Sequence, residues 1–146
     1  QLYGLIVPLG TQGATIPGRL GGTGCATDYH GGTALQQQGT GQQAVIGSDA
    51  LRFLEEAKVF MIGAGALGCE LLKMFSLMGV SSAGAGELTC TDNDAIEVSN
   101  LNRQFLFRKE HVGSNKSQTA VAVTQRMNPK FRAKGLIDLV SEATEK

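Results

Sequence analysis

The sequence contains few cysteines, only two histidines and no excess of charge of either sign. Its three cysteines, Cys25, Cys69 and Cys90, are odd in number and widely separated, which is typical of a reducing compartment and not of a disulfide scaffold. No two of them have the spacing of a zinc site, and His30 and His111 have no companions with which to form one. We therefore expect no metal site within this chain.

Net charge and long apolar runs are also missing. Lysine plus arginine number 13, as do aspartate plus glutamate, so the formal net charge is +0 and indicates neither nucleic acid nor a membrane surface as a partner. No apolar run reaches the roughly 18 residues of a transmembrane helix, and the start lacks the pattern of a secretory signal. The first residue is Gln1 and not methionine, so we expect the chain to be part of a longer polypeptide.

The composition changes near residue 44. Residues 1–43 are rich in Gly, Gln and Thr and show little periodicity, so we predict that they are mostly loop or disordered. A strand is possible within residues 2–9, although Pro8 counts against it. Residues 44–146 are denser in apolar residues and are predicted to form one modest domain with its own core.

The second region alternates between helical and strand patterns. Helical periodicity and capping residues predict helices at 49–56, 67–78 and 116–127. Short apolar runs predict strands at 58–62, 87–91 and 131–137. The first of these strands has no polar alternation, which is typical of a strand buried on both faces. The order strand, helix, strand, helix, strand predicts an α/β fold with right-handed crossovers and a parallel sheet.

Three glycines lie directly after the first predicted strand and open the following helix. In Gly63-x-Gly65-x-x-Gly68, the first allows a tight turn, the second allows the backbone to approach a phosphate, and the third allows close packing of helix on strand. The helix N-terminus then offers free N–H groups to an anion. The alternative is a glycine-rich turn that only joins two elements, but the flanking strand and helix favour a nucleotide site.

Asp92 ends the second predicted strand, 24 residues after Gly68. At about this distance a carboxylate accepts hydrogen bonds from ribose hydroxyls. The alternative is a strand-end aspartate that caps a turn. These features alone do not separate an enzyme that uses a nicotinamide or flavin from one that uses ATP.

The segment that follows favours a triphosphate. Asn100, Arg103 and Gln104 can present several donors to phosphate oxygens, and Lys116 adds a point charge at the start of the next helix. Each charge-assisted hydrogen bond contributes about 1.5–3 kcal/mol, so two cations could stabilise a transition state in phosphoryl chemistry. Arg103 could instead form a surface ion pair, and Lys116 could be a solvated lysine.

Other notable side chains in the same region are expected to be structural. Phe105, Leu106 and Phe107 are predicted to fill the core rather than stack on a base. Cys69 and Cys90 fall on a predicted helix and strand, where cysteine is more often a small buried hydrophobe than a nucleophile.

Taken together, these strings resemble the active adenylation domain of ubiquitin-activating enzymes, within the ThiF/MoeB-like superfamily. The resemblance rests on residues 63–73, on Thr91-Asp92-Asn93-Asp94 and on the string SNLNRQFLFR at 99–108, and it extends over roughly residues 41–146. Residues 42–49 and the glycine-containing turn at 79–87 resemble the ubiquitin branch in particular. The string at 99–108 is highly specific, whereas the glycine motif alone is not.

The resemblance implies a Rossmann-like parallel sheet with flanking helices that is incomplete, being the N-terminal half of an adenylation domain. It implies ATP and Mg²⁺ as cofactors and ubiquitin as a partner, whose C-terminal glycine is adenylated and then passed to a cysteine of the enzyme as a thioester. It further implies ubiquitin-conjugating enzymes as later partners, and a location in cytoplasm and nucleus.

By similarity, the site residues can be carried over one by one. Asp92 would hold the ribose and Asp94 would lie close to it, while Ala66 would contact the nucleotide beside Gly63, Gly65 and Gly68. Asn100, Arg103 and Gln104 would line the triphosphate and Lys116 would reach it, with Arg103 and Lys116 as catalytic cations. Val140 and Ser141 fall where the adenine pocket would be.

The sequence departs from this family in two ways. The Arg-Tyr-Asp that usually opens the domain is Gln-Gly-Thr at 38–40, and neither the magnesium-binding aspartate nor the catalytic cysteine lies within the 146 residues. We therefore predict that this chain alone completes neither adenylation nor thioester formation. Three alternatives stay open: activation of another ubiquitin-like modifier, an NAD-dependent oxidoreductase, and a non-catalytic partner subunit, which the presence of Arg103 and Lys116 disfavours.

Overall fold

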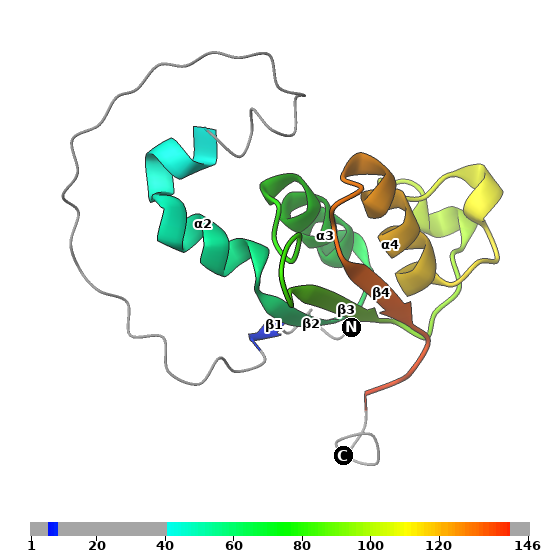
Figure 1. Cartoon of the computed structure of the whole chain (residues 1–146). Helices are drawn as coiled ribbons and strands as arrows, with labels where there is room; N and C mark the ends of the chain where they lie inside the picture. Colours follow the sequence, from blue (N-terminus) through cyan, green and yellow to red (C-terminus); the bar gives the residue numbers. More distant parts are fainter. Residues whose placement is uncertain (1–5, 9–40, 141–146) are drawn as a thin grey trace.

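The computed structural model describes residues 6–8 and 41–140, whose arrangement Figure 1 shows. One sheet holds four strands: β1 (Ile6–Pro8), β2 (Lys58–Ile62), β3 (Glu87–Thr91) and β4 (Ala133–Leu136). β2, β3 and β4 are parallel neighbours in chain order, while β1 pairs antiparallel with β2 at the edge of the sheet. The three parallel strands confirm the predicted Rossmann-like arrangement.

Along the chain, the helices alternate with the strands, as the sequence pattern predicts. They are α2 (Ser48–Glu55), α3 (Ala66–Met78) and α4 (Lys116–Met127), and two short 3-10 helices occupy Val98–Asn100 and Lys109–His111. Gly79 ends α3 in the left-handed conformation, with φ of 76°. Asn115 is the N-cap of α4, where its side-chain oxygen accepts from the backbone N–H of Gln118 at 3.2 Å.

Both long helices cover the same face of the sheet (Figure 1). The buried core beneath them joins apolar side chains of the strands, the helices and the connecting segments, including Met61, Leu72, Leu88, Leu106, Phe107 and Phe131. Buried polar groups link α3 to α4, because Ser76 donates to the carbonyl of Thr124 at 2.9 Å and Asn128 donates to the carbonyl of Ser76 at 2.8 Å. The two helices therefore form one layer, held at a defined register.

One expectation about β2 is wrong. The strand is not buried on both faces: Val59 and Met61 face the helices and are buried, whereas Phe60 and Ile62 alternate with them and are only partly buried. The reason is that α3 and α4 lie on one side of the sheet, so the apolar residues of the opposite face have less cover. The apolar run at residues 58–62 could not reveal which face of the sheet the helices cover.

Part of the N-terminal prediction can be compared with the structure. The possible strand within residues 2–9 is present as β1, Ile6–Pro8, and residues 41–46 are helical. The remaining residues predicted to be loop or disordered lie outside the described residues, so the domain boundary near residue 44 stays a prediction. Within residues 41–140, no helix has the length and apolarity needed to cross a membrane.

Candidate functional site

A cleft of about 580 Å³ opens at the carboxyl ends of the parallel strands. In open α/β sheets, ligands bind at this edge. The cleft is lined by residues from the glycine turn, the end of β3, residues 98–104, the start of α4 and the residues that follow β4. The lining residues are Ile62, Gly63, Gly65, Ala66, Leu67, Gly68, Thr91, Asp92, Asn93, Asp94, Asn100, Arg103, Gln104, Lys116, Asp138, Leu139 and Val140. The fold therefore brings together every predicted site residue that the structure describes; Ser141 lies outside the described residues.

The glycine turn has the geometry that the sequence motif predicts. Gly63 has a positive φ of 95°, which favours glycine. A Cβ on Gly68 would lie 2.2 Å from the carbonyl oxygen of Gly63, so only glycine allows α3 to start this close to β2. No side chain caps the first turn of α3, whose free N–H groups lie at the cleft. The turn therefore presents an uncapped helix N-terminus to any anion in the cleft.

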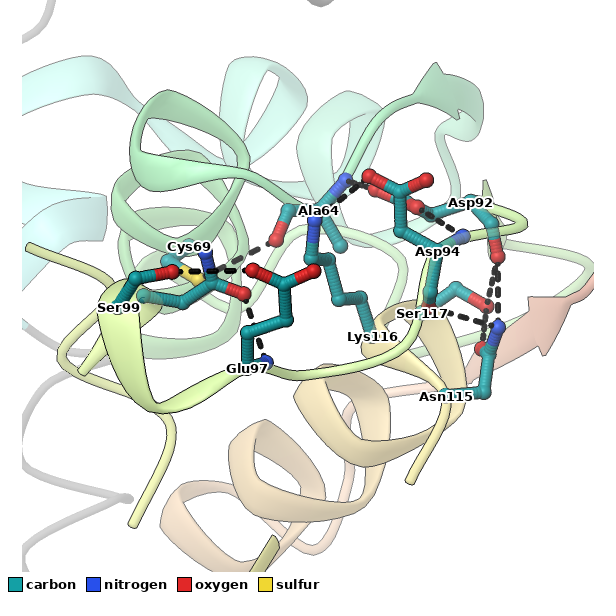
Figure 2. A network of polar contacts seen from close by, with 10 residues as sticks. Ala64, Cys69, Asp92, Asp94, Glu97, Ser99, Asn115, Lys116 and Ser117 are labelled. Atoms are coloured by element: carbon teal, nitrogen blue, oxygen red, sulfur yellow. Dashed lines mark hydrogen bonds and ion pairs between the residues drawn. The ribbon is translucent and has the colours of Figure 1, made fainter. Parts of the chain in front are cut away.

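Asp92 connects the glycine turn to the end of β3 (Figure 2). One of its carboxylate oxygens accepts from the backbone N–H of Ala64 at 2.6 Å, and the other accepts from that of Asp94 at 2.9 Å. Each oxygen has a second lone pair, so the carboxylate can still accept hydrogen bonds from a ligand hydroxyl. Asp92 thus holds the turn in shape and keeps acceptor capacity toward the cleft.

Lys116 is the first residue of α4 and its charge is largely shielded from water. Its side chain is 11% exposed, and its ammonium lies 2.7 Å from the carboxylate of Asp94, whose side chain is 62% exposed. The alternative, a solvated surface lysine, is therefore excluded. The pair places a positive charge at the cleft that the N-terminus of α3 also lines, and the aspartate is the more exposed residue of the pair.

Residues 98–104, which begin with the first 3-10 helix, bring the remaining predicted residues to the same cleft. Asn100 is buried, and its side-chain oxygen accepts from the backbone N–H of Glu97 at 2.9 Å. Arg103 is exposed, and its guanidinium donates to the carbonyl of Ser99 at 2.9 Å and to Asn102 at 3.1 Å. No ion pair forms at Arg103 in the described part of the chain, so its charge is held by neutral oxygens only.

Gln104 is an unusual residue of the cleft. It is 4% exposed, and its Oε1 is the one buried side-chain oxygen or nitrogen without a hydrogen-bond partner among residues 41–140. A buried polar group left without a partner costs about 1–3 kcal/mol. A ligand or water in the cleft that donates to this oxygen would remove that cost.

The structure adds residues that the sequence pattern did not indicate. Asp138, Leu139 and Thr91 line the cleft, together with Ile62 and Leu67, and the hydroxyl of Thr91 donates to the carbonyl of Asp138. Their position in the sequence could have indicated most of them, because residues at or just after the carboxyl end of a parallel strand lie at this edge of the sheet.

Cysteine chemistry and a bound metal are not supported by the described residues. Cys69 and Cys90 are fully buried, and burial raises the pKa of each thiol to about 12, so both are protonated at neutral pH. Among residues 41–140, no group of three or more His, Cys, Asp or Glu could hold a metal ion. Asp92 and Asp94 bring only two carboxylates to the cleft, fewer oxygen ligands than the octahedral shell of Mg²⁺ requires, so these residues do not by themselves form an Mg²⁺ site.

Comparison with known proteins identifies the family. Residues 40–145 match the ThiF family over most of the chain. The chain belongs to the ThiF family. Among curated relatives of this ThiF-family chain, the wheat (Triticum aestivum) ubiquitin-activating enzyme E1 1 is 50% identical over 104 residues, which are 71% of this chain and 10% of the relative. The human (Homo sapiens) ubiquitin-like modifier-activating enzyme 1 is 48% identical over 114 residues, 77% of this chain and 11% of that protein. The chain therefore spans about a tenth of the length of these relatives.

Solved structures with the same fold include nucleotide complexes. The tRNA N6-threonylcarbamoyladenosine dehydratase TcdA of E. coli, solved with ATP, aligns with a TM-score of 0.64 at 25% identity over 73% of this chain and 42% of TcdA. E. coli MccB, solved with AMPCPP and MccA, aligns with a TM-score of 0.57 at 29% identity over 65% of this chain and 27% of MccB. These comparisons confirm the Rossmann-like ThiF fold and the homology of the chain to ubiquitin-activating enzymes.

The arrangement has a clear chemical capacity. The helix N-terminus of α3, the ammonium of Lys116 and the guanidinium of Arg103 line one cleft and all favour negative charge. Asp92 and the partnerless oxygen of Gln104 supply acceptors for hydroxyl or amino groups. A ligand with a polyphosphate at one end and a sugar at the other matches this distribution of donors and acceptors.

Proposed function

We propose that this chain is the ATP-binding part of an enzyme that activates ubiquitin by adenylating its C-terminal glycine. The observation that carries the proposal is the position of Lys116, a shielded ammonium held at the same cleft as the free first turn of α3. Homology to ubiquitin-activating enzymes supports the choice of substrate, and the nucleotide complexes of TcdA and MccB support ATP.

In the proposed binding mode, the nucleotide spans the cleft. The ribose hydroxyls donate to Asp92, and the glycine turn at Gly65 and Ala66 lies against the nucleotide. Adenine lies toward Val140. The triphosphate then extends toward Arg103 and Lys116, where Asn100 and Gln104 close the side of the cleft. This orientation places the acceptors against the sugar and the cations against the phosphates.

The proposed reaction transfers adenylate to a carboxylate. An oxygen of the C-terminal carboxylate of ubiquitin bonds to the α-phosphorus, the bond between the α-phosphorus and the bridging oxygen breaks, and pyrophosphate leaves with the electron pair. Negative charge builds on the phosphate oxygens as this occurs, so cations fixed beforehand lower the barrier. Arg103 and Lys116 would supply that stabilisation. Mg²⁺ bound mainly through the triphosphate oxygens would neutralise part of the phosphate charge.

Lys116 would have to exchange partners in this mechanism. In the structure its ammonium binds Asp94. Phosphate oxygens carry more charge than one carboxylate and can compete for the ammonium, which leaves Asp94 exposed to water. Because the Asp94 side chain is already 62% exposed, water can solvate its carboxylate when the ammonium leaves, and the loss of the ion pair costs little free energy.

The proposal is tested by ATP–pyrophosphate exchange in the full-length protein, with ubiquitin as the acyl substrate. Exchange should require ubiquitin, and Arg103→Ala and Lys116→Ala should each lower its rate by at least about tenfold, the size of one charge-assisted hydrogen bond. Lys109→Ala is the matched control, because Lys109 is exposed and does not line the cleft.

Three results would contradict the proposal. Exchange that is unchanged in both variants would remove Arg103 and Lys116 from the reaction. Exchange that depends on another ubiquitin-like protein and not on ubiquitin would assign the enzyme to that modifier. Binding of NADH in preference to ATP, measured by calorimetry, would favour an NAD-dependent oxidoreductase and leave Arg103 without a triphosphate to bind.

A further inference from the structure

Lys116 occupies a position that a lysine does not favour. It is the first residue of α4, where the helix dipole presents its positive end, and no acidic residue lies in the first turn to compensate. The side chain is also 11% exposed, so its charge is largely out of water. A cation placed against both local preferences needs support from the surrounding structure.

Part of that support comes from the loop after β3. The ammonium of Lys116 donates to the carboxylate of Asp94 at 2.7 Å, and its backbone N–H donates to the carbonyl of Asp94 at 3.0 Å. The two residues are therefore joined by main chain and side chain. Both bonds require the loop that carries Asp94 to stay at this distance from the start of α4.

Asn115 holds that distance with one amide group (Figure 2). Its oxygen faces α4, where it accepts from the backbone N–H of Gln118 at 3.2 Å and from the hydroxyl of Ser117 at 2.7 Å. Its nitrogen faces the loop, where it donates to the carbonyls of Asp92 at 2.9 Å and Asp94 at 3.2 Å. The side chain thus caps the helix with one end and binds the backbone of both cleft aspartates with the other.

Only an amide of this length can do both. Serine and aspartate cap helices about as well as asparagine, and threonine somewhat less well, but serine and threonine have a single hydroxyl and ionised aspartate has no donor. The donor half of Asn115 is therefore separable from its capping half. A substitution that keeps a capping oxygen removes the link to Asp92 and Asp94 alone.

We propose that Asn115 is a positioning residue for the phosphate end of the nucleotide, acting through Asp94 and Lys116. Its amide nitrogen fixes the loop after β3 against the N-terminus of α4, and so fixes where Asp94 holds the ammonium of Lys116 before the phosphates replace Asp94 as its partner. This inference rests on the proposed function, because it assumes that the cleft binds ATP.

The test compares Asn115→Ala with Asn115→Ser in the full-length protein. Thermal unfolding reports the cap, and calorimetry with ATP and with adenosine reports the phosphate end and the sugar end separately. Asn115→Ala should lower the unfolding midpoint by a few degrees, and Asn115→Ser should restore most of it. Both variants should lose about tenfold in affinity for ATP while their affinity for adenosine stays within about twofold of wild type.

Thr124→Ala is the matched control for stability. Thr124 is buried in the same helix, its hydroxyl donates to the carbonyl of Ala120 at 2.9 Å, and it does not line the cleft. This variant should lower the unfolding midpoint and leave the ratio of ATP to adenosine affinity unchanged. If the ratio of ATP affinity to adenosine affinity also fell in Thr124→Ala, the ratio would depend on the stability of the protein and the inference about Asn115 would be overturned.

The outcomes separate this inference from the proposed function. If ATP affinity in Asn115→Ser recovers together with stability, the residue is only a helix cap and the inference is overturned. If wild type binds ATP and both variants keep the wild-type ratio, the inference is also overturned and the proposed function stands. If wild type binds no ATP, the proposed function fails first.

Discussion

The carboxylate of Asp92 accepts a 2.6 Å hydrogen bond from the backbone N–H of Ala64, across 28 residues of sequence. This contact joins the turn after β2 to the end of β3 and so sets the shape of the cleft. The same carboxylate is the proposed acceptor for the ribose. A residue with both roles should affect stability and binding together.

Replacement of Asp92 by alanine should therefore weaken both properties. Two backbone N–H groups lose their acceptor, so the free energy of unfolding should fall by about 1–3 kcal/mol in urea titrations. Affinity for ATP and for adenosine should fall by similar factors, because both carry the ribose. Asp49→Ala, an exposed change in the first turn of α2, is the control. Unchanged affinity for adenosine in Asp92→Ala would exclude the ribose contact.

Substitution by alanine should lower stability at Gly68 but not at Gly65. In Gly68→Ala, the new Cβ would meet the carbonyl oxygen of Gly63 at 2.2 Å, so unfolding measurements should show a loss of about 1–3 kcal/mol or more. In Gly65→Ala, no heavy atom lies within 4 Å of the new Cβ, so stability should hold. If the backbone at Gly65 approaches a phosphate, this second variant should nevertheless lose affinity for ATP. A stable Gly68→Ala variant would contradict the packing argument.

The two buried cysteines should make the protein less stable at alkaline pH. Burial raises the pKa of Cys69 and of Cys90 to about 12, compared with 9.0 for an unperturbed thiol. The unfolded chain then releases protons between about pH 9 and pH 12 that the folded chain retains, so stability is complete below pH 9 and falls as pH rises through this window. The slope can reach about 1.4 kcal/mol per pH unit for each cysteine.

Urea unfolding at several pH values between 8 and 11 measures this slope. A Cys69→Ala/Cys90→Ala variant, although less stable at every pH, should show a smaller decrease with pH than its parent. Both proteins contain the same lysines and tyrosines, whose titration cancels in the comparison. Equal slopes in the two proteins would show that the thiols do not carry the effect.

The link between α3 and α4 should be purely structural. Asn128 donates to the carbonyl of Ser76 at 2.8 Å and accepts from the backbone N–H of Lys130 at 3.0 Å, and it is 4% exposed. Asn128→Ala should lower the free energy of unfolding by about 1–3 kcal/mol, because the carbonyl of Ser76 loses a donor in the core. Affinity for ATP, measured well below the unfolding midpoint, should be unchanged.

Asn102→Ala serves as the control for that measurement. Asn102 is exposed and accepts only from the neighbouring guanidinium of Arg103 at 3.1 Å, so its loss should change stability by less than about 0.5 kcal/mol. A weaker ATP affinity in Asn128→Ala would instead mean that the helix layer transmits strain to the cleft.

The amino-acid sequence by itself determined the type and order of the α-helices and β-strands from residue 48 to residue 136, although not the two 3-10 helices between β3 and α4. Gly79 ends α3 and Asn115 caps α4 at the boundaries that the sequence predicted for these helices, because capping depends on backbone geometry within a few residues. The glycine turn, Asp92 and the start of α4 could be assigned to one edge because parallel strands place all their carboxyl ends together.

Only the tertiary structure decided which groups bind one another at that edge. The pairing of Lys116 with Asp94, the double role of Asn115 and the partnerless oxygen of Gln104 depend on distances between segments that are remote in sequence. The one-sided burial of β2 and the antiparallel pairing of β1 likewise depend on which face and which edge other elements occupy. Local patterns carry no information about such contacts, because a side chain's partner is set by the packing of whole elements and not by its neighbours in the chain.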